Sequence, residues 1–310
     1  MMLLLLAAAL PGLLWDAPPD TAPALREAGI TRVLVPRARL SAWQNVAGIS
    51  AEPADPQPAV KLRPPGVNYR IDLGSASRSP WLDLNGWQYQ RRPQGRFTYE
   101  AKGAQAALAA AEAFCYGGSA MVHPDDAGLK PFAQMLEFLR GVDKPDMPAL
   151  ADIGFLDDGS PAAGEVMNLM MRENLLFQIV RQPDPKLKLN VRLGTKDFPL
   201  EDAKNPGVMA HAVRAKLTDE KRSVRIYGSL VVVARVTVAP DGLRVHLLNY
   251  AGAQRKVDGV RVRVLGHYEK HRLAAAGSPG EELLDFVADT DATEFTLPEL
   301  KTYAVIDLSR

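Results

Sequence analysis

Residues 241–250 read DGLRVHLLNY, and this stretch decides the fold class of the last quarter of the chain. Asp241 and Gly242 provide a two-residue turn signal, and the apolar residues after them alternate with Arg244 and His246. Alternation with a period of two is typical of a β-strand with one buried face, and a DG pair between apolar runs is typical of a hairpin. The stretch therefore predicts a strand that pairs with the run before the turn.

The period of two continues beyond this strand. Residues 260–264 read VRVRV, residues 294–297 read EFTL, and an apolar run, YAVI, follows at 303–306. No helix-period pattern interrupts the sequence after Ser229. We therefore expect an antiparallel β-sandwich over residues 229–310.

Between residues 148 and 228 the sequence alternates strand patterns with helix patterns. Residues 153–156 predict a buried strand. Ser160 and Pro161 then signal the start of a helix, because serine caps a helix and proline fits its first turn. The apolar run 177–180 returns as a strand. This order predicts a small doubly wound α/β segment.

The chain before residue 148 also mixes helices and strands. Residues 13–18 and 30–36 predict two strands, and residues 22–28 predict a short helix between them. A strand, a crossover helix and a second strand imply parallel pairing. The Ala-rich stretch 104–116 is a strong helix former. We expect an α/β region built like a TIM barrel but reduced in size.

Two stretches lack a regular pattern and help to divide the chain. Residues 50–65 are rich in Pro, Ala and Asp, and we expect a loop there. Residues 143–148 contain two prolines and no period, and we place a domain boundary there. The expected divisions are a signal segment over 1–10, a reduced barrel-like region over 11–147, the α/β segment over 148–228 and the sandwich over 229–310.

The first ten residues, MMLLLLAAAL, are similar to the apolar part of a secretory signal, although no Lys or Arg precedes them. They predict a secreted or periplasmic protein. A buried first strand, or a start codon assigned at the wrong place, is the alternative. The run is too short to cross a bilayer, which takes about 20 apolar residues, so we expect no membrane span.

Charge and composition indicate which classes of partner to expect. The chain has 310 residues with 37 Lys and Arg against 36 Asp and Glu, which leaves a formal net charge of +1. Such a balance gives no basic field for a phosphate backbone, so we expect no nucleic-acid partner. The composition, 47% hydrophobic and 24% charged, is that of an ordinary globular protein with a packed core.

The sequence predicts neither a metal site nor a cofactor. The single cysteine, Cys115, lies in an apolar run and is expected to be a buried core residue. The five histidines show no metal-ligand spacing; His267 and His271 are four apart, but in a β context that does not align them. Gly117 and Gly118 lack the Lys and Ser or Thr of a phosphate-binding loop.

The order of these regions resembles that of large glycoside hydrolases of the β-galactosidase type, in which a catalytic barrel precedes a smaller α/β domain and a β domain. The stretches that carry the resemblance are residues 13–18 with 29–35, residues 80–87, residues 246–250 and residues 302–308. The resemblance implies a carbohydrate ligand. A full barrel takes about 250 residues, so the α/β region here is expected to be shortened.

Three aspartates are the candidate catalytic residues. In parallel α/β folds ligands meet the carboxyl ends of strands, and Asp16, Asp83 and Asp157 each end a different expected strand. Glycoside hydrolysis takes two carboxylates about 5–5.5 Å or about 6.5–9.5 Å apart. We expect the three carboxylates to converge on one rim. The alternative is that they cap helices or build turns.

The candidate substrate-binding residues combine flat apolar faces with hydrogen-bonding groups, as sugar recognition requires. Aromatic residues of this kind also pack in cores, which is the alternative interpretation. Glu112 and Glu165, within expected helices, are interpreted as structural. The binding candidates are Asn85, Trp87, Tyr89, Arg91 and His123.

Two hypotheses about function follow. The first is a glycoside hydrolase-like protein that acts on or binds an extracytoplasmic carbohydrate at the carboxyl-end rim of its parallel strands, with Asp83 among the acid–base groups. The second is a non-catalytic carbohydrate-binding or scaffold protein descended from such an enzyme. The short barrel and the lack of a recognisable Glu pair favour the second, and the residues around Asp83 favour the first. Homo-oligomerisation stays open.

Overall fold

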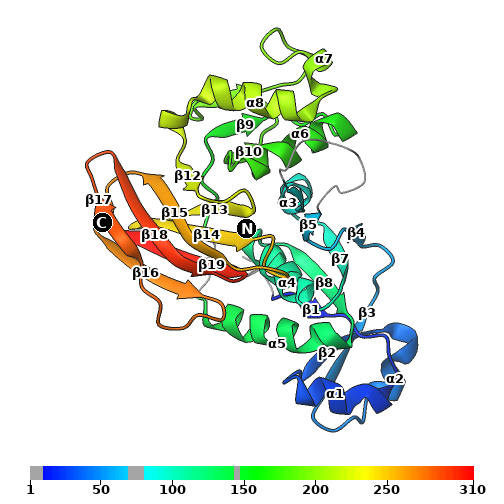
Figure 1. Cartoon of the computed structure of the whole chain (residues 1–310). Helices are drawn as coiled ribbons and strands as arrows, with labels where there is room; N and C mark the ends of the chain where they lie inside the picture. Colours follow the sequence, from blue (N-terminus) through cyan, green and yellow to red (C-terminus); the bar gives the residue numbers. More distant parts are fainter. Residues whose placement is uncertain (1–9, 69–79, 143–146) are drawn as a thin grey trace, which may run out of the picture.

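The computed structural model describes residues 10–68, 80–142 and 147–310, and they form three regions (Figure 1). Parallel strands and their helices make up the amino-terminal region, a small α/β layer follows, and two antiparallel sheets complete the chain. The expected signal segment falls outside the described residues except for Leu10. No helix of the described residues is long and apolar enough to span a membrane.

Six parallel strands curve through the amino-terminal region in the order β3-β2-β1-β8-β7-β4, and we call them the parallel arc. A parallel β-bridge between Leu14 and Leu34 joins the four-stranded sheet β1-β8-β7-β4 to the two-stranded sheet β2-β3. The described residues contain no ladder between β3 and β4, so the arc is not a closed barrel. The strands are β1 (Gly12–Leu13), β2 (Arg32–Pro36), β3 (Ser50–Ala54), β4 (Val60–Leu62), β7 (Arg96–Ala101) and β8 (Ser119–Pro124).

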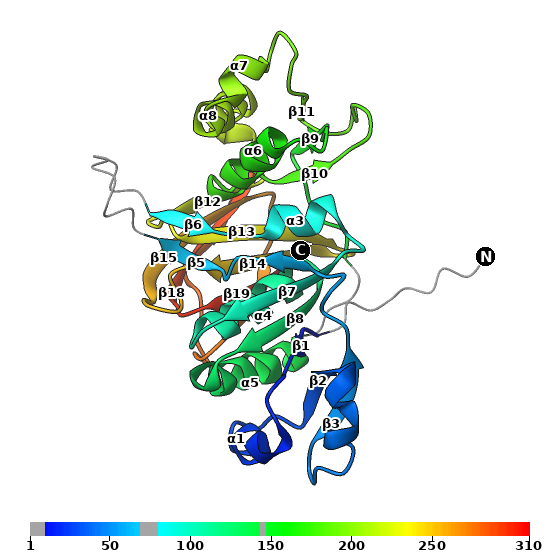
Figure 2. The ribbon, with the colours of Figure 1, turned by 90° about the vertical axis from the view of Figure 1, so that its right-hand side faces the viewer.

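Helices and one hairpin accompany the arc. Figure 2 shows β7, β8 and β1 side by side, with β2 and β3 below them. The helices are α1 (Ala22–Glu27), α2 (Leu40–Trp43), α3 (Gly86–Arg91), α4 (Gln105–Cys115) and α5 (Asp126–Gly141), and the hairpin strands are β5 (Gly66–Asn68) and β6 (Trp81–Asp83).

The expected loop over residues 50–65 is wrong, because β3 and β4 lie within it. Pro53 made this stretch look irregular, since proline cannot donate a ladder hydrogen bond. β3 pairs only with β2 and therefore ends the arc, where one edge of the strand is unpaired. Proline is tolerated at such an edge.

The second region is a three-stranded parallel sheet in the order β10-β9-β11. Its first helix starts as expected, because Ser160 Oγ accepts a hydrogen bond from the Ala163 amide at 3.1 Å and Pro161 takes the first position. Only α6 connects two strands of this sheet, so the expected doubly wound arrangement is not formed. The elements are β9 (Ile153–Phe155), α6 (Pro161–Arg172), β10 (Phe177–Ile179), β11 (Leu189–Val191), α7 (Leu200–Ala203) and α8 (Pro206–Leu217).

The expected β-sandwich is present, with sheets β12-β15-β18-β17 and β13-β14-β19-β16. The turn at Asp241 joins β13 to β14, and no helix occurs over residues 229–310, all of which are described. β12 pairs with β15, so the sandwich begins before the expected boundary at 229. The strands are β12 (Val224–Tyr227), β13 (Val232–Ala239), β14 (Gly242–Asn249), β15 (Val257–Leu265), β16 (Lys270–Ala275), β17 (Leu284–Ala288), β18 (Ala292–Leu300) and β19 (Tyr303–Ser309).

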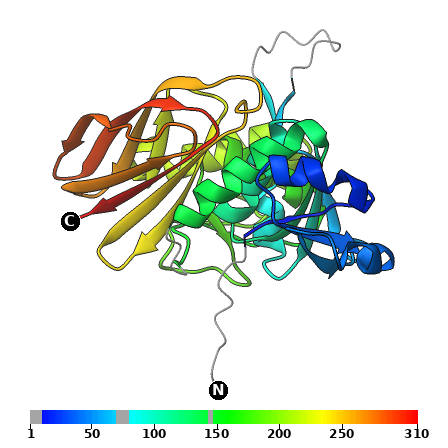
Figure 3. The same ribbon diagram turned by 90° about the horizontal axis from the view of Figure 1, so that it is seen from below.

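The buried helix α4 joins the arc to the sandwich. It packs against α5, β8 and β14, and Figure 3 shows the green helices between the blue amino-terminal elements and the orange and red sandwich strands. Ten of its eleven residues are buried, Cys115 among them. The ring centroids of Phe114 and Tyr303 lie 6.5 Å apart across this junction.

Glu112 of α4 is fully buried at the same junction. Its carboxylate accepts hydrogen bonds from the Tyr250 hydroxyl at 2.6 Å, the Tyr99 hydroxyl at 2.8 Å, and the amide and side chain of Asn85 at 2.7 and 3.0 Å. Burial raises the pKa of Glu112, and the hydrogen bonds from Tyr250 and Asn85 oppose that shift. Glu112 thus ties β7, the start of α3 and the sandwich together, which agrees with its structural interpretation.

Candidate functional site

A histidine between two carboxylates lies at the carboxyl ends of β1, β7 and β8, and we call these three residues the rim cluster. Asp16 follows β1, Glu100 is in β7, and His123 is in β8, directly opposite Glu100 in the parallel register. His123 Nδ1 lies 2.9 Å from Glu100 Oε2, and His123 Nε2 lies 3.2 Å from Asp16 Oδ1. Both ring nitrogens of one imidazole therefore contact a carboxylate.

The rim cluster is open to solvent. The exposed fractions of the side chains are 57% for Asp16, 50% for Glu100 and 24% for His123. Carboxylates accept hydrogen bonds, and an imidazole can donate or accept them, so the group can meet several hydroxyls of one ligand. Its position matches the general rule that ligands of parallel α/β folds bind at the carboxyl ends of strands.

The structure brings together two of the predicted residues, Asp16 and His123, and adds Glu100, which sequence reasoning missed. The signal was present: Phe97, Tyr99 and Ala101 are apolar and alternate with polar residues. That pattern predicts a strand ending near Glu100.

The expected convergence of Asp16, Asp83 and Asp157 on one rim is wrong. Their strands belong to three different sheets, because Asp83 is in β6, which pairs antiparallel with β5, and Asp157 follows β9 of the second region. Asp157 instead accepts two hydrogen bonds from Arg91, at 2.6 and 2.8 Å. The carboxyl-end rule places Asp16 and His123 at the same edge, because β1 and β8 share a sheet.

Three of the expected substrate-binding residues are committed to protein partners. Tyr89 is buried, and its hydroxyl lies 2.6 Å from that of Tyr99. The Asn85 side chain donates to Glu112 and to the backbone carbonyl of Arg63. Arg91 is bound to Asp157. α3 starts at Gly86 and carries Tyr89 and Arg91 inward.

Trp87 and Asp83 line a cavity. It has a volume of about 340 Å³ and lies between the end of β4, β6, α3 and α6; we call it the tryptophan cleft. Asp83 lies 3.8 Å from Arg63, the first residue after β4, and accepts a hydrogen bond from Asn68. The cleft is lined by Arg63, Trp81, Asp83, Trp87, Glu165 and Asn168, among others.

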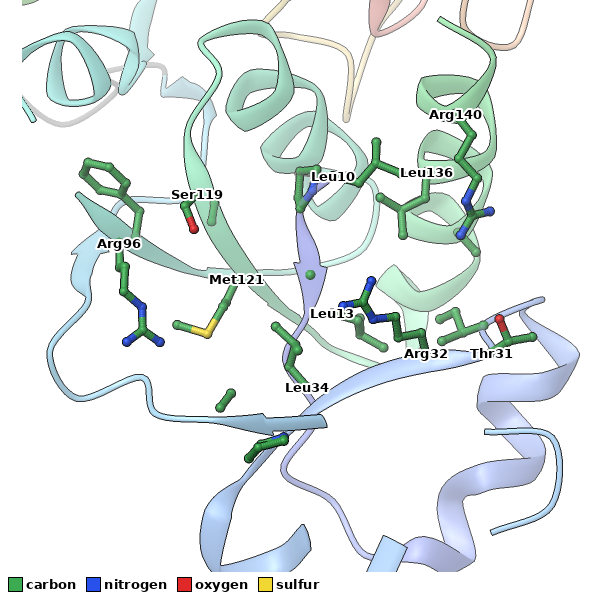
Figure 4. Close-up of a pocket in the computed structure, with 18 of the residues that line it drawn as sticks. Leu10, Leu13, Thr31, Arg32, Leu34, Arg96, Ser119, Met121, Leu136 and Arg140 are labelled. Carbon is green, nitrogen blue, oxygen red and sulfur yellow. The ribbon is translucent and has the colours of Figure 1, made fainter. Parts of the chain in front are cut away.

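A larger cavity of about 520 Å³ lies at the opposite, amino-terminal end of the strands (Figure 4). Leu10, Leu34 and Met121 contribute apolar walls, and three arginines line it. Each arginine already has a partner: Arg32 pairs with Glu52, Arg140 pairs with Glu137, and Arg96 donates to a backbone carbonyl. This end of a parallel arc is not the one at which ligands usually bind.

Within residues 10–68, 80–142 and 147–310, no group of three or more His, Cys, Asp or Glu side chains is arranged to hold a metal ion.

Comparisons with known proteins concern the fold. No protein-family model and no curated protein matches the sequence. Among solved structures, α-L-fucosidase isoenzyme 2 from Paenibacillus thiaminolyticus matches 73% of this chain and 64% of its own, with 10% identity and a TM-score of 0.54. A rhamnosidase from Novosphingobium sp. PP1Y matches 82% of this chain and 34% of its own, with 11% identity and a TM-score of 0.48.

A catalytic mutant of a GH42 β-galactosidase from G. stearothermophilus matches 96% of this chain and 60% of its own, with 8% identity and a TM-score of 0.37. The chain thus spans less than two thirds of each of these three proteins. The fold, a parallel-stranded α/β region with antiparallel sheets, is similar to that of the α-L-fucosidase.

Proposed function

We propose that this protein binds a carbohydrate at the rim cluster. The observation that carries the proposal is the contact of one imidazole, His123, with the carboxylates of Asp16 and Glu100 at the carboxyl ends of three neighbouring strands. Sugar hydroxyls donate and accept hydrogen bonds, and the cluster offers both kinds of group within one ligand's reach. The glycoside-hydrolase-like fold supports the same ligand class.

Hydrolysis is the second candidate, and the spacing of the two carboxylates favours it. Asp16 and Glu100 each contact a ring nitrogen of His123, so their nearest oxygens lie no more than about 8 Å apart, within reach of the separations that glycosidases use. For turnover the imidazole would move aside, and one carboxyl would protonate the leaving oxygen while the other assisted a water or attacked the sugar.

The site of action is proposed to be outside the cytoplasm. The support for this is the apolar run over residues 1–10, which is similar to a secretory signal. Fractionation of cells that express the full chain tests this point, because a protein recovered in the cytosol with Met1 intact would contradict export.

Binding is tested on a glycan array with the purified full chain and three variants, His123→Ala, Asp16→Asn and Glu100→Gln. We expect each to lower the affinity for the strongest ligand about tenfold, which corresponds to one lost hydrogen bond to a charged group. Glu137→Gln is the matched control, because Glu137 is an exposed carboxylate on α5 that pairs only with Arg140. Unchanged affinity in all three rim variants would refute the rim assignment.

Hydrolysis is tested with a panel of aryl glycosides. In the enzyme hypothesis, Asp16→Asn or Glu100→Gln abolishes turnover and retains binding of the intact sugar. A wild-type protein that binds glycans and releases no aglycone from the panel is a binding protein, and the second candidate is then rejected.

A further inference from the structure

The cavity of about 520 Å³ at the amino-terminal ends of the strands has positive charge in its lining and no negative charge (Figure 4). The described residues that line it include Arg32 of β2, Arg96 of β7 and Arg140 of α5, and none of them is Asp or Glu. Its volume lies within the range of about 300–1,000 Å³ that is usual for small-ligand sites. The lining therefore favours a ligand that carries negative charge.

Two of these guanidinium groups are accessible and keep donors for such a ligand. Arg32 contacts Glu52 through Nη2, and Arg140 contacts Glu137 through Nη1, each at 2.7 Å. A guanidinium has five N–H donors, so within the described part of the chain each group uses only part of its capacity. The Arg32 side chain is 68% exposed and that of Arg140 is 52% exposed, so a ligand can reach both.

Apolar side chains beside the arginines are also accessible. Leu10 and Leu136 line the cavity and are only half-buried, so part of each side chain is open to a ligand. Figure 4 shows Arg32 and Arg140 on the side of β1 that faces Leu136, with Arg96 on the other side. Covering open apolar surface is favourable, by roughly 25 cal/mol per Å². Cationic groups next to such surface suit a ligand with two parts, an acidic head and an apolar body.

A small core separates this cavity from the rim cluster. Side chains alternate along a strand, so Met121, which lines the cavity, and His123 of the rim cluster are on the same face of β8. Met121 packs with Leu14 and Ala54 in a cluster of buried residues. These side chains fill the space between the two ends of the strands, so the cavity and the rim cluster are separate sites.

We infer that this cavity binds an amphipathic organic acid, whose carboxylate contacts Arg32 and Arg140 and whose hydrocarbon body lies against Leu10 and Leu136. Arginine recognises carboxylates through charge-assisted hydrogen bonds, which are stronger than those between neutral groups. Ligands of closed barrels bind at the opposite ends of the strands, so this site is an additional one. The inference does not depend on the proposed function, because no step of it involves a sugar.

Calorimetry with the full chain and three probes tests the two parts of the ligand. Octanoate has a charged head and an apolar chain, octanamide has the same chain without the charge, and acetate has the charge without the chain. We expect saturable binding of octanoate, at least about tenfold weaker binding of octanamide and no detectable binding of acetate. Equal affinities for octanoate and octanamide, or no binding of octanoate, would overturn the inference.

Arg32→Gln and Arg140→Gln test the head-group contacts. Each should lower the affinity for octanoate about tenfold and leave the affinity for octanamide unchanged. Both ion pairs are exposed and contribute little to stability, so the variants should fold. Arg261→Gln is the matched control, because the Arg261 side chain is 61% exposed and pairs with Glu294 in the sandwich. Wild-type affinity for octanoate in both cavity variants would contradict the assignment.

Ser119→Trp tests the place of binding without a change in charge. Ser119 is exposed at the start of β8 and lines the cavity, so an indole there takes up part of its volume. Aromatic residues are favourable in strands, and we expect the variant to fold and to lose octanoate binding. Octanoate binding as tight as in the wild type would place the acid elsewhere and overturn the inference. His123→Ala should bind octanoate like the wild type, which keeps this test independent of the rim cluster.

Discussion

The β-sandwich and the parallel arc are stabilised in different ways. The sandwich has its own core, in which the facing sides of its two sheets meet around Val245, Val262, Phe295 and Ile306. The core of the arc continues instead into α6 of the second region and onto the outer side of the sheet that contains β14 and β19, where Tyr250 lies. An incomplete barrel can therefore persist when another domain covers the apolar surface that barrel closure would otherwise bury.

Among the variants that test whether the arc depends on its junction with the sandwich, Glu112→Ala should have the largest effect. It removes four hydrogen bonds at the junction and leaves the Tyr99 and Tyr250 hydroxyls buried without their acceptor. We expect a loss of about 3 kcal/mol or more in the free energy of unfolding, measured by urea denaturation. A loss below about 1 kcal/mol would show that the arc does not depend on this junction.

The second test is Arg91→Ala, which cuts the link between α3 and the loop after β9. Arg91 and Asp157 are both largely buried, and their bond is bidentate, so the variant strands the Asp157 carboxylate. The expected loss is about 2–3 kcal/mol, and Arg91→Lys should recover only part of it because lysine cannot make the paired contact.

Arg140→Ala provides the control for Arg91. Its partner, Glu137, is exposed, and exposed ion pairs contribute little, so we expect a change of less than about 1 kcal/mol. Equal losses in the two variants would contradict the importance of the α3 link.

The third test uses pH, because the two regions carry carboxyl groups whose pKa values shift in opposite directions. Burial raises the pKa of Glu112 in the folded state, so its contribution to stability is present below its ordinary value of 4.5 and is lost as the pH rises through the folded-state value. Wild type and Glu112→Gln should therefore differ in the slope of stability against pH above 4.5, by up to about 1.4 kcal/mol per pH unit.

The pKa of Glu299, in the sandwich, shifts in the opposite direction. Hydrogen bonds from Lys256 and Lys301 lower its pKa to about 2. The contribution of Glu299 to the stability of the folded state is present above pH 4.5 and is lost as the pH falls toward 2. Glu299→Gln should reduce the loss of unfolding free energy below pH 4.5 and leave it unchanged above that pH. Urea denaturation between pH 3 and pH 8 measures this, and a change above pH 4.5 would contradict the prediction.

The smallest expected effect belongs to the rim cluster. Asp16 and Glu100 are half exposed or more, so Asp16→Asn and Glu100→Gln should alter the free energy of unfolding by less than about 0.5 kcal/mol while they lower sugar affinity. Residues that matter for binding and not for stability are those a ligand uses. A large stability loss in these variants would make the rim cluster part of the scaffold instead.

The central strands of the sandwich could be predicted, because their residues alternate with a period of two, whereas β12, β16 and β17 were not assigned to it. The exception is also informative: Leu247 and Leu248 interrupt the alternation, since both faces of β14 are buried, one in the sandwich core and one against α4. The sequence also predicted the start of α6, because Ser160 and Pro161 are typical of a helix amino terminus. These signals are local, so one sequence suffices to find them.

The candidate site could be predicted only in part, because it depends on which strands share a sheet. Asp16 and His123 were found from their places at strand ends, and topology brings them together through the pairing of β1 with β8. The same rule failed for Asp83 and Asp157, whose strands lie in other sheets.

The pairing of β1 with β8 has a consequence for how the chain folds. Gly12 pairs with Met121, and the Tyr250 that completes the Glu112 junction is encoded later still. At about 5–20 residues per second, the ribosome delivers β8 on the order of ten seconds after β1. During that time the first strand has an unpaired edge, and long-range pairing of this kind is slow even when the whole chain is available. We therefore expect the nascent chain to be more prone to aggregation before β8 is synthesised than after it.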